Sequence, residues 1–227
     1  MSLDPALQRL LARPDIWQGR QRTGLPTGEA TGFDALDTRL PAGGWPRGGL
    51  TELLPARPGI GELRLLMPAL ARLSRGARWV AWIDPPHIPY AAGLYAAGVD
   101  LAHTLVVRAR DGHERLWALE QALRAGTCAA VLGWPGTLDG TAARRLQLAA
   151  EAGGCLGFLF RPPEARDEPS FAALRLMLSS ERGGLLLESL RQKGGDSAMR
   201  LHIAATDLFP PAVGQDEHAT LADRGNN

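Results

Sequence analysis

Short runs of apolar residues alternate along most of the chain with segments whose apolar residues recur at helical spacing. The runs that are typical of buried strands cover residues 50–54, 78–83, 104–107, 129–132 and 155–160. Helical spacing covers residues 62–73, 88–97, 114–124 and 141–152. Strands buried on both faces and separated by helices form parallel sheets, so the pattern predicts an α/β fold with a mostly parallel, twisted sheet and helices on both faces.

Beyond residue 170 the pattern changes, because strand-like stretches follow one another with only short turns between them. These stretches cover residues 174–178, 184–190 and 199–204. Closely spaced strands joined by glycine-containing turns are typical of antiparallel hairpins, and we expect these to extend the sheet.

The two ends of the chain lack this alternation. Asp4 and Pro5 are typical of a helix start, and we expect residues 1–29 to form an N-terminal helix and a linker. Residues 30–207 are enough for one domain with its own core. Residues 208–227 are polar and show no periodicity, which predicts a disordered tail.

The charge balance does not favour any class of partner. Lysine and arginine together number 25 against 24 acidic residues, so the net charge does not indicate binding to nucleic acid or to an anionic membrane. No membrane-spanning run or signal-peptide pattern is found, so we expect a cytoplasmic protein. Cys128 and Cys155 lie in apolar runs and the five histidines lack ligand spacing, so we expect neither a disulfide nor a metal site.

The turn after the first strand lies where ATPases of this fold hold phosphate on backbone N–H groups. A P-loop needs two glycines five positions apart, followed by lysine and then serine or threonine. Here the first glycine is replaced by Ala56 and the second is Gly61, while Glu62 and Leu63 replace the lysine and the hydroxyl residue. A carboxylate repels phosphate and leucine cannot hold Mg²⁺, so we expect a pseudo-ATPase without a cofactor. In the simplest alternative, Gly59 and Gly61 form a tight turn and Glu62 favours the start of the next helix.

Other residues of interest have ordinary explanations. One reading makes Asp84 a lone base beside His87, but no nucleophile completes a triad. We expect Asp84 to cap a helix that begins near residue 88. Of the six tryptophans, Trp45 and Trp134 lie in loops next to proline and glycine. These two are candidates for a surface contact, including stacking on nucleic-acid bases.

Several sequence segments of the chain resemble the RecA ATPase core. They are Thr31-Gly-Phe-Asp-Ala-Leu-Asp37, Gly43-Gly-Trp-Pro-Arg-Gly-Gly-Leu-Thr-Glu52 and Gly59-Ile-Gly-Glu-Leu-Arg64. Within that superfamily the chain resembles the ImuA family, through Gly61-Glu-Leu-Arg-Leu-Leu66, Val131-Leu-Gly-Trp134 and Gly157-Phe-Leu-Phe-Arg-Pro162. Residues 50–163 are also similar to SulA, the cell-division inhibitor of the damage response, which shares the Gly-Trp and Gly-Phe-x-x-Arg-Pro phrases.

The ImuA resemblance implies a non-catalytic accessory protein of SOS-induced mutagenic translesion DNA synthesis. Its expected partners are an ImuB-like polymerase-related protein and an error-prone DNA polymerase, with RecA as a further candidate. Contact with DNA would be indirect or weak, and no small-molecule substrate is expected. The alternative is a SulA-like inhibitor of cell division that acts on FtsZ. An ATPase with an unusual nucleotide site is the least favoured reading, because Glu62 and Leu63 oppose it.

The RecA resemblance also points to individual positions. Two acidic residues of the RecA site have no counterpart here. Gly133 stands at the position of the acid beside the metal ion, and Pro86 stands at the position of the glutamate that orients the attacking water. Basic residues of RecA near the segment Leu190-Arg-Gln-Lys193 reach a neighbour's nucleotide, and this segment favours ImuA over SulA. We therefore add Arg161, Arg191 and Lys193 to the candidate interaction residues, with solvated charges at strand ends as the plain alternative.

Overall fold

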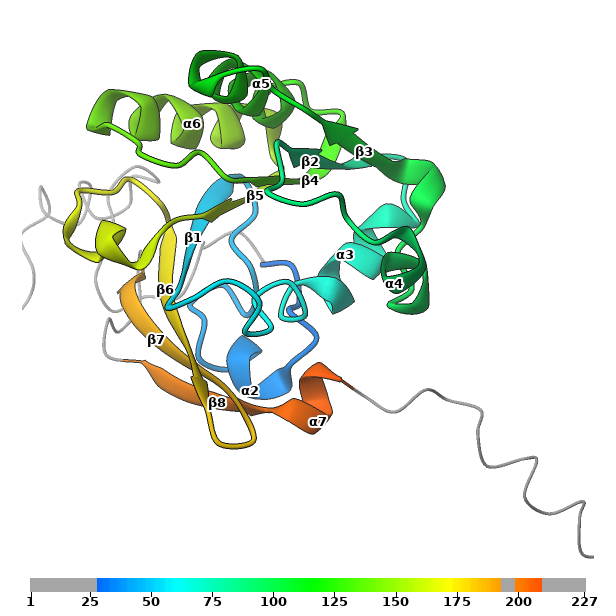
Figure 1. Cartoon of the computed structure of the whole chain (residues 1–227), viewed down its shortest axis with the longest axis vertical. Helices are drawn as coiled ribbons and strands as arrows, with labels where there is room; N and C mark the ends of the chain where they lie inside the picture. The colour runs from blue at the N-terminus through cyan, green and yellow to red at the C-terminus, as the bar shows by residue number, and fades with distance from the viewer. Residues whose placement is uncertain (1–27, 193–198, 210–227) are drawn as a thin grey trace, which may run out of the picture.

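The computed structural model describes residues 28–192 and 199–209. Eight strands form one sheet in the order β3-β2-β4-β5-β1-β6-β7-β8 (Figure 1). The strands are β1 (Gly49–Pro55), β2 (Trp79–Ile83), β3 (Thr104–Val107), β4 (Cys128–Gly133), β5 (Leu156–Phe160), β6 (Leu174–Glu181), β7 (Gly184–Gln192) and β8 (Arg200–Ala204). Neighbours from β3 to β6 pair in parallel, and β6, β7 and β8 pair antiparallel. The prediction of an α/β fold extended by antiparallel strands is confirmed.

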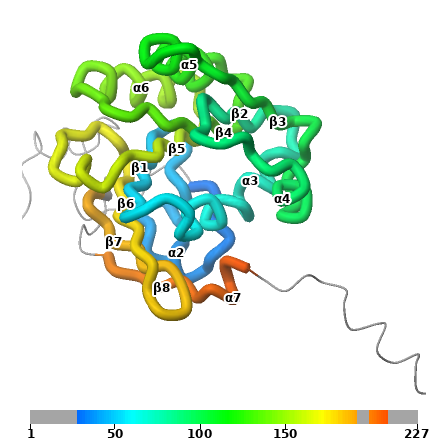
Figure 2. Tube along the Cα trace, viewed as in Figure 1, coloured from blue at the N-terminus to red at the C-terminus, as the bar shows by residue number. Residues whose placement is uncertain are grey.

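Helices cover both faces of this sheet. They are α2 (Asp34–Asp37), α3 (Met67–Ser74), α4 (Ala91–Ala96), α5 (Gly112–Arg124), α6 (Gly140–Gly153) and α7 (Ala205–Leu208), with short 3-10 helices η1 (Leu101–His103) and η2 (Pro163–Asp167). One buried cluster joins α2, α3, α4 and α7 to one face, and the other cluster joins α5 and α6 to the opposite face. Leu36 of α2 and Leu208 of α7 belong to the same buried cluster, although these helices lie near opposite ends of the described chain, as the colours of Figure 2 show.

Residue alternation along β2 explains how one strand serves two cores. Val80 and Trp82 belong to the first cluster, whereas Ala81 and Ile83 belong to the second. Successive side chains of a strand point to opposite faces, so a strand that is apolar throughout is buried on both. The apolar runs at β1, β2, β4 and β5 therefore correspond to central parallel strands, whereas the run at residues 104–107 forms the edge strand β3, where Leu105 and Val106 are exposed.

The helices α5 and α6 form where the sequence places them, because each has a strong local start. The Asp111 carboxylate accepts a hydrogen bond from the Glu114 N–H at 2.8 Å, and Asp139 accepts one from the Ala142 N–H at 2.7 Å. Such side-chain caps satisfy N–H groups that have no partner within the helix. Gly154, with φ of 59°, then ends α6 in the left-handed conformation that glycine adopts readily.

Two predicted helices are shorter than expected. The helix predicted over residues 62–73 begins only at Met67, because residues 62–66 form turns closed by i to i+3 bonds such as Leu66 N–H to Leu63 O. The helix predicted over residues 88–97 begins at Ala91. Pro85, Pro86 and Pro89 lack backbone donors and restrict the residue before them, which keeps the approach to α4 extended.

The ends of the predicted domain are only partly described. The N-terminal helix expected within residues 1–29 lies outside the described residues, except that Glu29 forms a β-bridge with Trp45. Leu208 was expected in the tail but is buried at the end of α7, so the domain includes it. The rest of the expected tail, residues 210–227, lies outside the described residues. Within the described ranges, no helix is long and apolar enough to cross a membrane.

Candidate functional site: an apolar pocket at the carboxyl edge of the sheet

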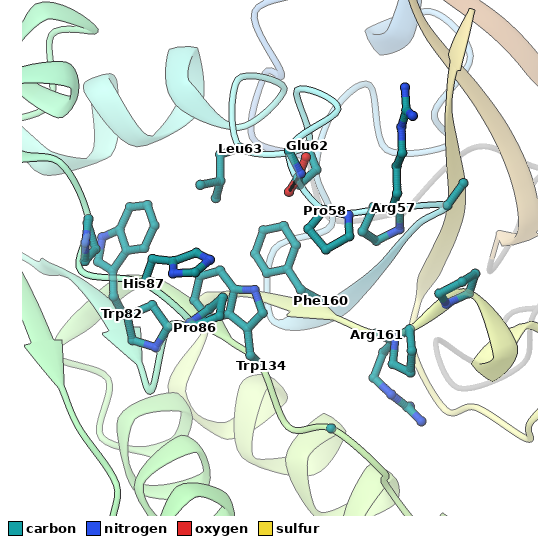
Figure 3. A pocket seen from close by; sticks show the side chains of 18 of the residues that line it. Arg57, Pro58, Glu62, Leu63, Trp82, Pro86, His87, Trp134, Phe160 and Arg161 are labelled. Carbon is teal, nitrogen blue, oxygen red and sulfur yellow. Dashed lines mark hydrogen bonds between the residues drawn. The ribbon is translucent and has the colours of Figure 1, made fainter.

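A pocket of about 830 Å³ opens where β1, β2, β4 and β5 end (Figure 3). The carboxyl edge of a parallel sheet is the usual ligand position in α/β folds, so the pocket occupies the expected place. Its lining is mostly proline, aromatic and aliphatic. The residues are Pro55, Ala56, Arg57, Pro58, Gly59, Glu62, Leu63, Trp82, Pro85, Pro86, His87, Ile88, Pro89, Tyr90, Trp134, Gly136, Phe160, Arg161, Pro162 and Pro163.

The loop after β1 forms one wall, and two of its backbone donors are already occupied. Glu62 Oε1 accepts a hydrogen bond from the Gly59 N–H at 2.9 Å, and Glu62 Oε2 accepts one from the Gly61 N–H at 3.1 Å. Gly59 and Gly61 have φ of 82° and 108°, a region that side chains disfavour. A P-loop offers such amides to phosphate, so the Glu62 carboxylate stands where an anion would bind.

The loop geometry bears on the expected roles of Glu62 and Leu63. Glu62 does not start a helix, because its carboxylate folds back on the loop and α3 begins at Met67. Leu63 is partly buried against the core and lines the pocket. Leucine has no oxygen for Mg²⁺, so neither residue can take the role of the P-loop residue at its position.

Three aromatic side chains form the opposite wall. The rings of Trp134 and Phe160 stack with centroids 4.6 Å apart and planes 8° apart, while Trp82 and Trp134 lie 6.1 Å apart at 18°. They come from β2, from the residue after β4 and from the end of β5, so the parallel sheet brings them together. Trp134, a predicted surface contact, is partly buried and forms part of the pocket wall.

Trp45, the other predicted surface contact, lies in the core, and that prediction is wrong. Its side chain is fully buried and packs edge-on against Phe158 at 5.4 Å. The Glu29 and Trp45 backbones exchange two hydrogen bonds, which hold this loop against the sheet. Proline and glycine around Trp45 gave the appearance of an exposed loop, but the long-range bridge buries the side chain.

The position of the metal-side acid has no room for a side chain. A Cβ built on Gly133 would lie 2.2 Å from Leu119 Cδ2, and Leu119 is fully buried. Among the described residues, no three His, Cys, Asp or Glu side chains are arranged to hold a metal ion. Pro86, at the position of the water-orienting glutamate, lines the pocket.

Asp84 does not cap a helix, contrary to expectation. Its Oδ2 accepts a hydrogen bond from Arg115 Nε at 2.6 Å, and Arg108 lies 3.8 Å from its Oδ1. The residue has φ of 48°, which aspartate tolerates better than most side chains. Tyr90 precedes α4 without a side-chain cap, so Asp84 instead ties β2 to α5.

Arg161 belongs to a buried charge network that the sequence analysis missed. Glu52 Oε2 lies 2.7 Å from Arg175 Nε, and its Oε1 lies 3.6 Å from Arg161 Nη1. Arg161 Nη2 also pairs with Glu168 at 2.5 Å. Figure 3 shows the Arg161 side chain turned away from the aromatic wall. The available signal was a charged residue inside each apolar strand, Glu52 in β1 and Arg175 in β6.

The remaining candidates lie apart from the pocket. Arg191 is exposed on β7, and its Nη1 donates a hydrogen bond to the Ser170 carbonyl. Arg161 is buried, so it is not a solvated charge at a strand end. Lys193 lies outside the described residues.

Comparison with known proteins relates the middle of the chain to one family. Residues 50–157 match the family model described as "Cell division inhibitor SulA". SulA of Edwardsiella piscicida is 38% identical over 102 residues, covering 45% of this chain and 61% of that protein. SulA of Photorhabdus laumondii is 35% identical over 112 residues, covering 49% and 63%. The chain thus spans about six tenths of the length of these relatives.

A solved structure is also similar. The crystal structure of SulA from Pseudomonas aeruginosa is 30% identical, with a TM-score of 0.43, and the match covers 49% of this chain and 97% of that one.

These matches overturn the expected role in translesion DNA synthesis. The family model and the relatives named above are cell division inhibitors, so the ImuA-like function is wrong. The predicted ImuB-like, polymerase and RecA partners are wrong for the same reason. The segment near residue 190 favoured ImuA, but it lies outside the matched region. Over residues 50–157, the chain is similar to the SulA family.

Proposed function

We propose that this protein inhibits cell division in the manner of SulA, by binding FtsZ during the damage response. The observation that carries the proposal is the match of residues 50–157 to the SulA family model. The matched region runs from β1 into β5 and includes the Glu62 loop and Trp134. It therefore contains most of the pocket described above.

The same proposal includes a non-catalytic mechanism. Two amides of the pocket loop are hydrogen-bonded to Glu62, and Gly133, at the end of β4, has no space for an acid. Phosphoryl transfer depends on donors and a metal that hold the phosphates. We therefore propose a RecA-like core that has lost ATP turnover. The RecA-like sequence segments at residues 31–37, 43–52 and 59–64 support this proposal. Inhibition would then follow from binding alone.

Cell length is the test of this function. Controlled expression of the full chain in a rod-shaped bacterium should give long, undivided cells, because blocked FtsZ cannot form a division septum. Cells carrying the empty vector at the same growth rate are the control. Normal cell length despite soluble protein, confirmed by immunoblot, would contradict the proposal.

A further inference from the structure

We propose that the pocket at the carboxyl edge of the sheet docks an apolar segment of a partner protein that carries an acidic side chain. The proposal rests on the proposed function only for the identity of the protein that supplies the segment. It assigns the binding surface and the chemistry of the bound segment, neither of which follows from the family match.

Apolar surface continues from the cavity onto its rim. Trp134, Phe160 and Leu63 line the interior. Ile88 and Tyr90 stand at the rim with 80% and 78% of their surfaces exposed. Large contiguous apolar patches are rare on the surface of monomeric proteins, and those that occur often mark interaction sites. A protein segment that extends beyond the interior of the cavity would cover both side chains.

The charges around the pocket favour an acidic partner. The Glu62 carboxylate accepts hydrogen bonds from the backbone N–H groups of Gly59 and Gly61. The Arg161 guanidinium is paired with Glu52 and Glu168. Arg57 is exposed and makes no ion pair with any of the described residues.

Arg57 and the exposed His87 lie on opposite sides of the pocket (Figure 3). Both can donate hydrogen bonds, and the side chain of Arg57 ends in a guanidinium cation. A carboxylate of the partner would therefore find a cation at the rim, whereas a basic segment would be repelled.

The pocket is also rigid enough to bind without large rearrangement. Proline occupies seven lining positions, namely Pro55, Pro58, Pro85, Pro86, Pro89, Pro162 and Pro163. Proline fixes φ, so the walls lose little conformational freedom when a ligand binds. The volume of about 830 Å³ falls in the range of roughly 300–1,000 Å³ that is common for binding pockets.

The dye 8-anilinonaphthalene-1-sulfonate provides a direct probe, since it combines apolar rings with an anionic group. We expect the full chain to bind the dye with a rise in dye fluorescence. Arg57→Glu and the double variant Ile88→Ser/Tyr90→Ser should each weaken binding about tenfold, whereas Arg57→Lys should restore most of it. Trp117→Ser and Leu148→Ser, at exposed apolar positions on α5 and α6 outside the pocket lining, are the matched controls. Circular dichroism confirms that each variant is folded.

Equal dye binding by all variants, or no binding by the wild type, would overturn the pocket proposal. A second arm adds purified FtsZ, which should displace the dye and should be inhibited less by the Arg57→Glu variant. If FtsZ is inhibited equally by every variant and displaces no dye, the proposed function stands and the docking site is wrong. If FtsZ is not inhibited while the dye still separates the variants, the proposed function fails and the pocket chemistry stands.

Discussion

The Glu62 carboxylate accepts hydrogen bonds from the backbone N–H groups of Gly59 and Gly61, at 2.9 and 3.1 Å. The chain thus supplies its own anion to backbone amides of the kind that P-loop ATPases offer to the phosphate of a ligand. Glu62 thereby ties two glycines of the loop together through hydrogen bonds within the protein. The same loop lines a pocket whose surface is mostly apolar.

Replacing Glu62 tests this internal anion. Glu62→Ala should lower the free energy of unfolding by about 1 kcal/mol, because two loop amides lose a charged acceptor that is partly exposed to solvent. Urea denaturation measures the change. Glu62→Gln, which keeps one acceptor oxygen, should lose less than the alanine variant. Neither variant nor the wild type should show an ATP-dependent rise in Tm, and such a rise would show that the loop binds nucleotide.

Gly133 should not tolerate a side chain. Gly133→Asp should cost about 3 kcal/mol or more, because the new Cβ would lie 2.2 Å from Leu119 Cδ2 and the carboxylate would be buried. Gly140→Ala is the control, since a Cβ there meets no atom within 4 Å. Gly133→Ala should lower the free energy of unfolding less in a Leu119→Ala background than in the wild type. If the effects of the two substitutions simply add in this double-mutant cycle, the contact is contradicted.

The buried network around Glu52 should be needed for folding. Glu52→Gln removes the charge that faces both Arg175 and Arg161 and leaves two guanidinium groups buried with less compensation. We expect a loss of about 3–5 kcal/mol, the usual effect of breaking a buried ion pair. Glu181→Gln, which breaks an exposed pair with Arg200, should change the stability by less than about 1 kcal/mol. Equal effects of the two substitutions on the urea midpoint would show that the network is not buried in solution.

The thiol of Cys155 should react only after unfolding. Burial raises its pKa from 9.0 to about 12, so the folded state holds the thiol protonated. Because the pKa is raised in the folded state, its contribution to the free energy of unfolding is fully present below pH 9. This contribution is lost as the pH rises from 9 toward 12. With Cys128→Ser as background, a thiol reagent at pH 8 should label Cys155 in urea but not in buffer. Rapid labelling of the native protein would contradict this burial.

Much of the fold could be predicted from the sequence because its determinants are local. The apolar runs predicted the strands, and the caps at Asp111 and Asp139 account for the correct placement of α5 and α6. The helix over residues 62–73 was predicted too long because periodicity does not register a side chain that folds back on its own loop. The same limit applies to Asp84, whose arginine partners come from residues 108 and 115.

The candidate site could be predicted only in part. Spacing alone located the loop after β1 that lines the pocket, since Glu62 and Leu63 stand at fixed distances from Gly61. Trp45 was misplaced because its burial depends on a bridge to Glu29, sixteen positions earlier, and the Trp134–Phe160 stack depends on the strand order. Such contacts follow from tertiary pairing, which local patterns do not specify.

Sedimentation of FtsZ polymers in the presence of GTP tests the proposed inhibition with purified components. Addition of the full chain, without ATP, should reduce the amount of FtsZ in the pellet as the ratio of the chain to FtsZ rises. The same chain unfolded by heat is the control and should leave the pellet unchanged. An undiminished FtsZ pellet at an excess of folded protein would contradict a SulA-like function.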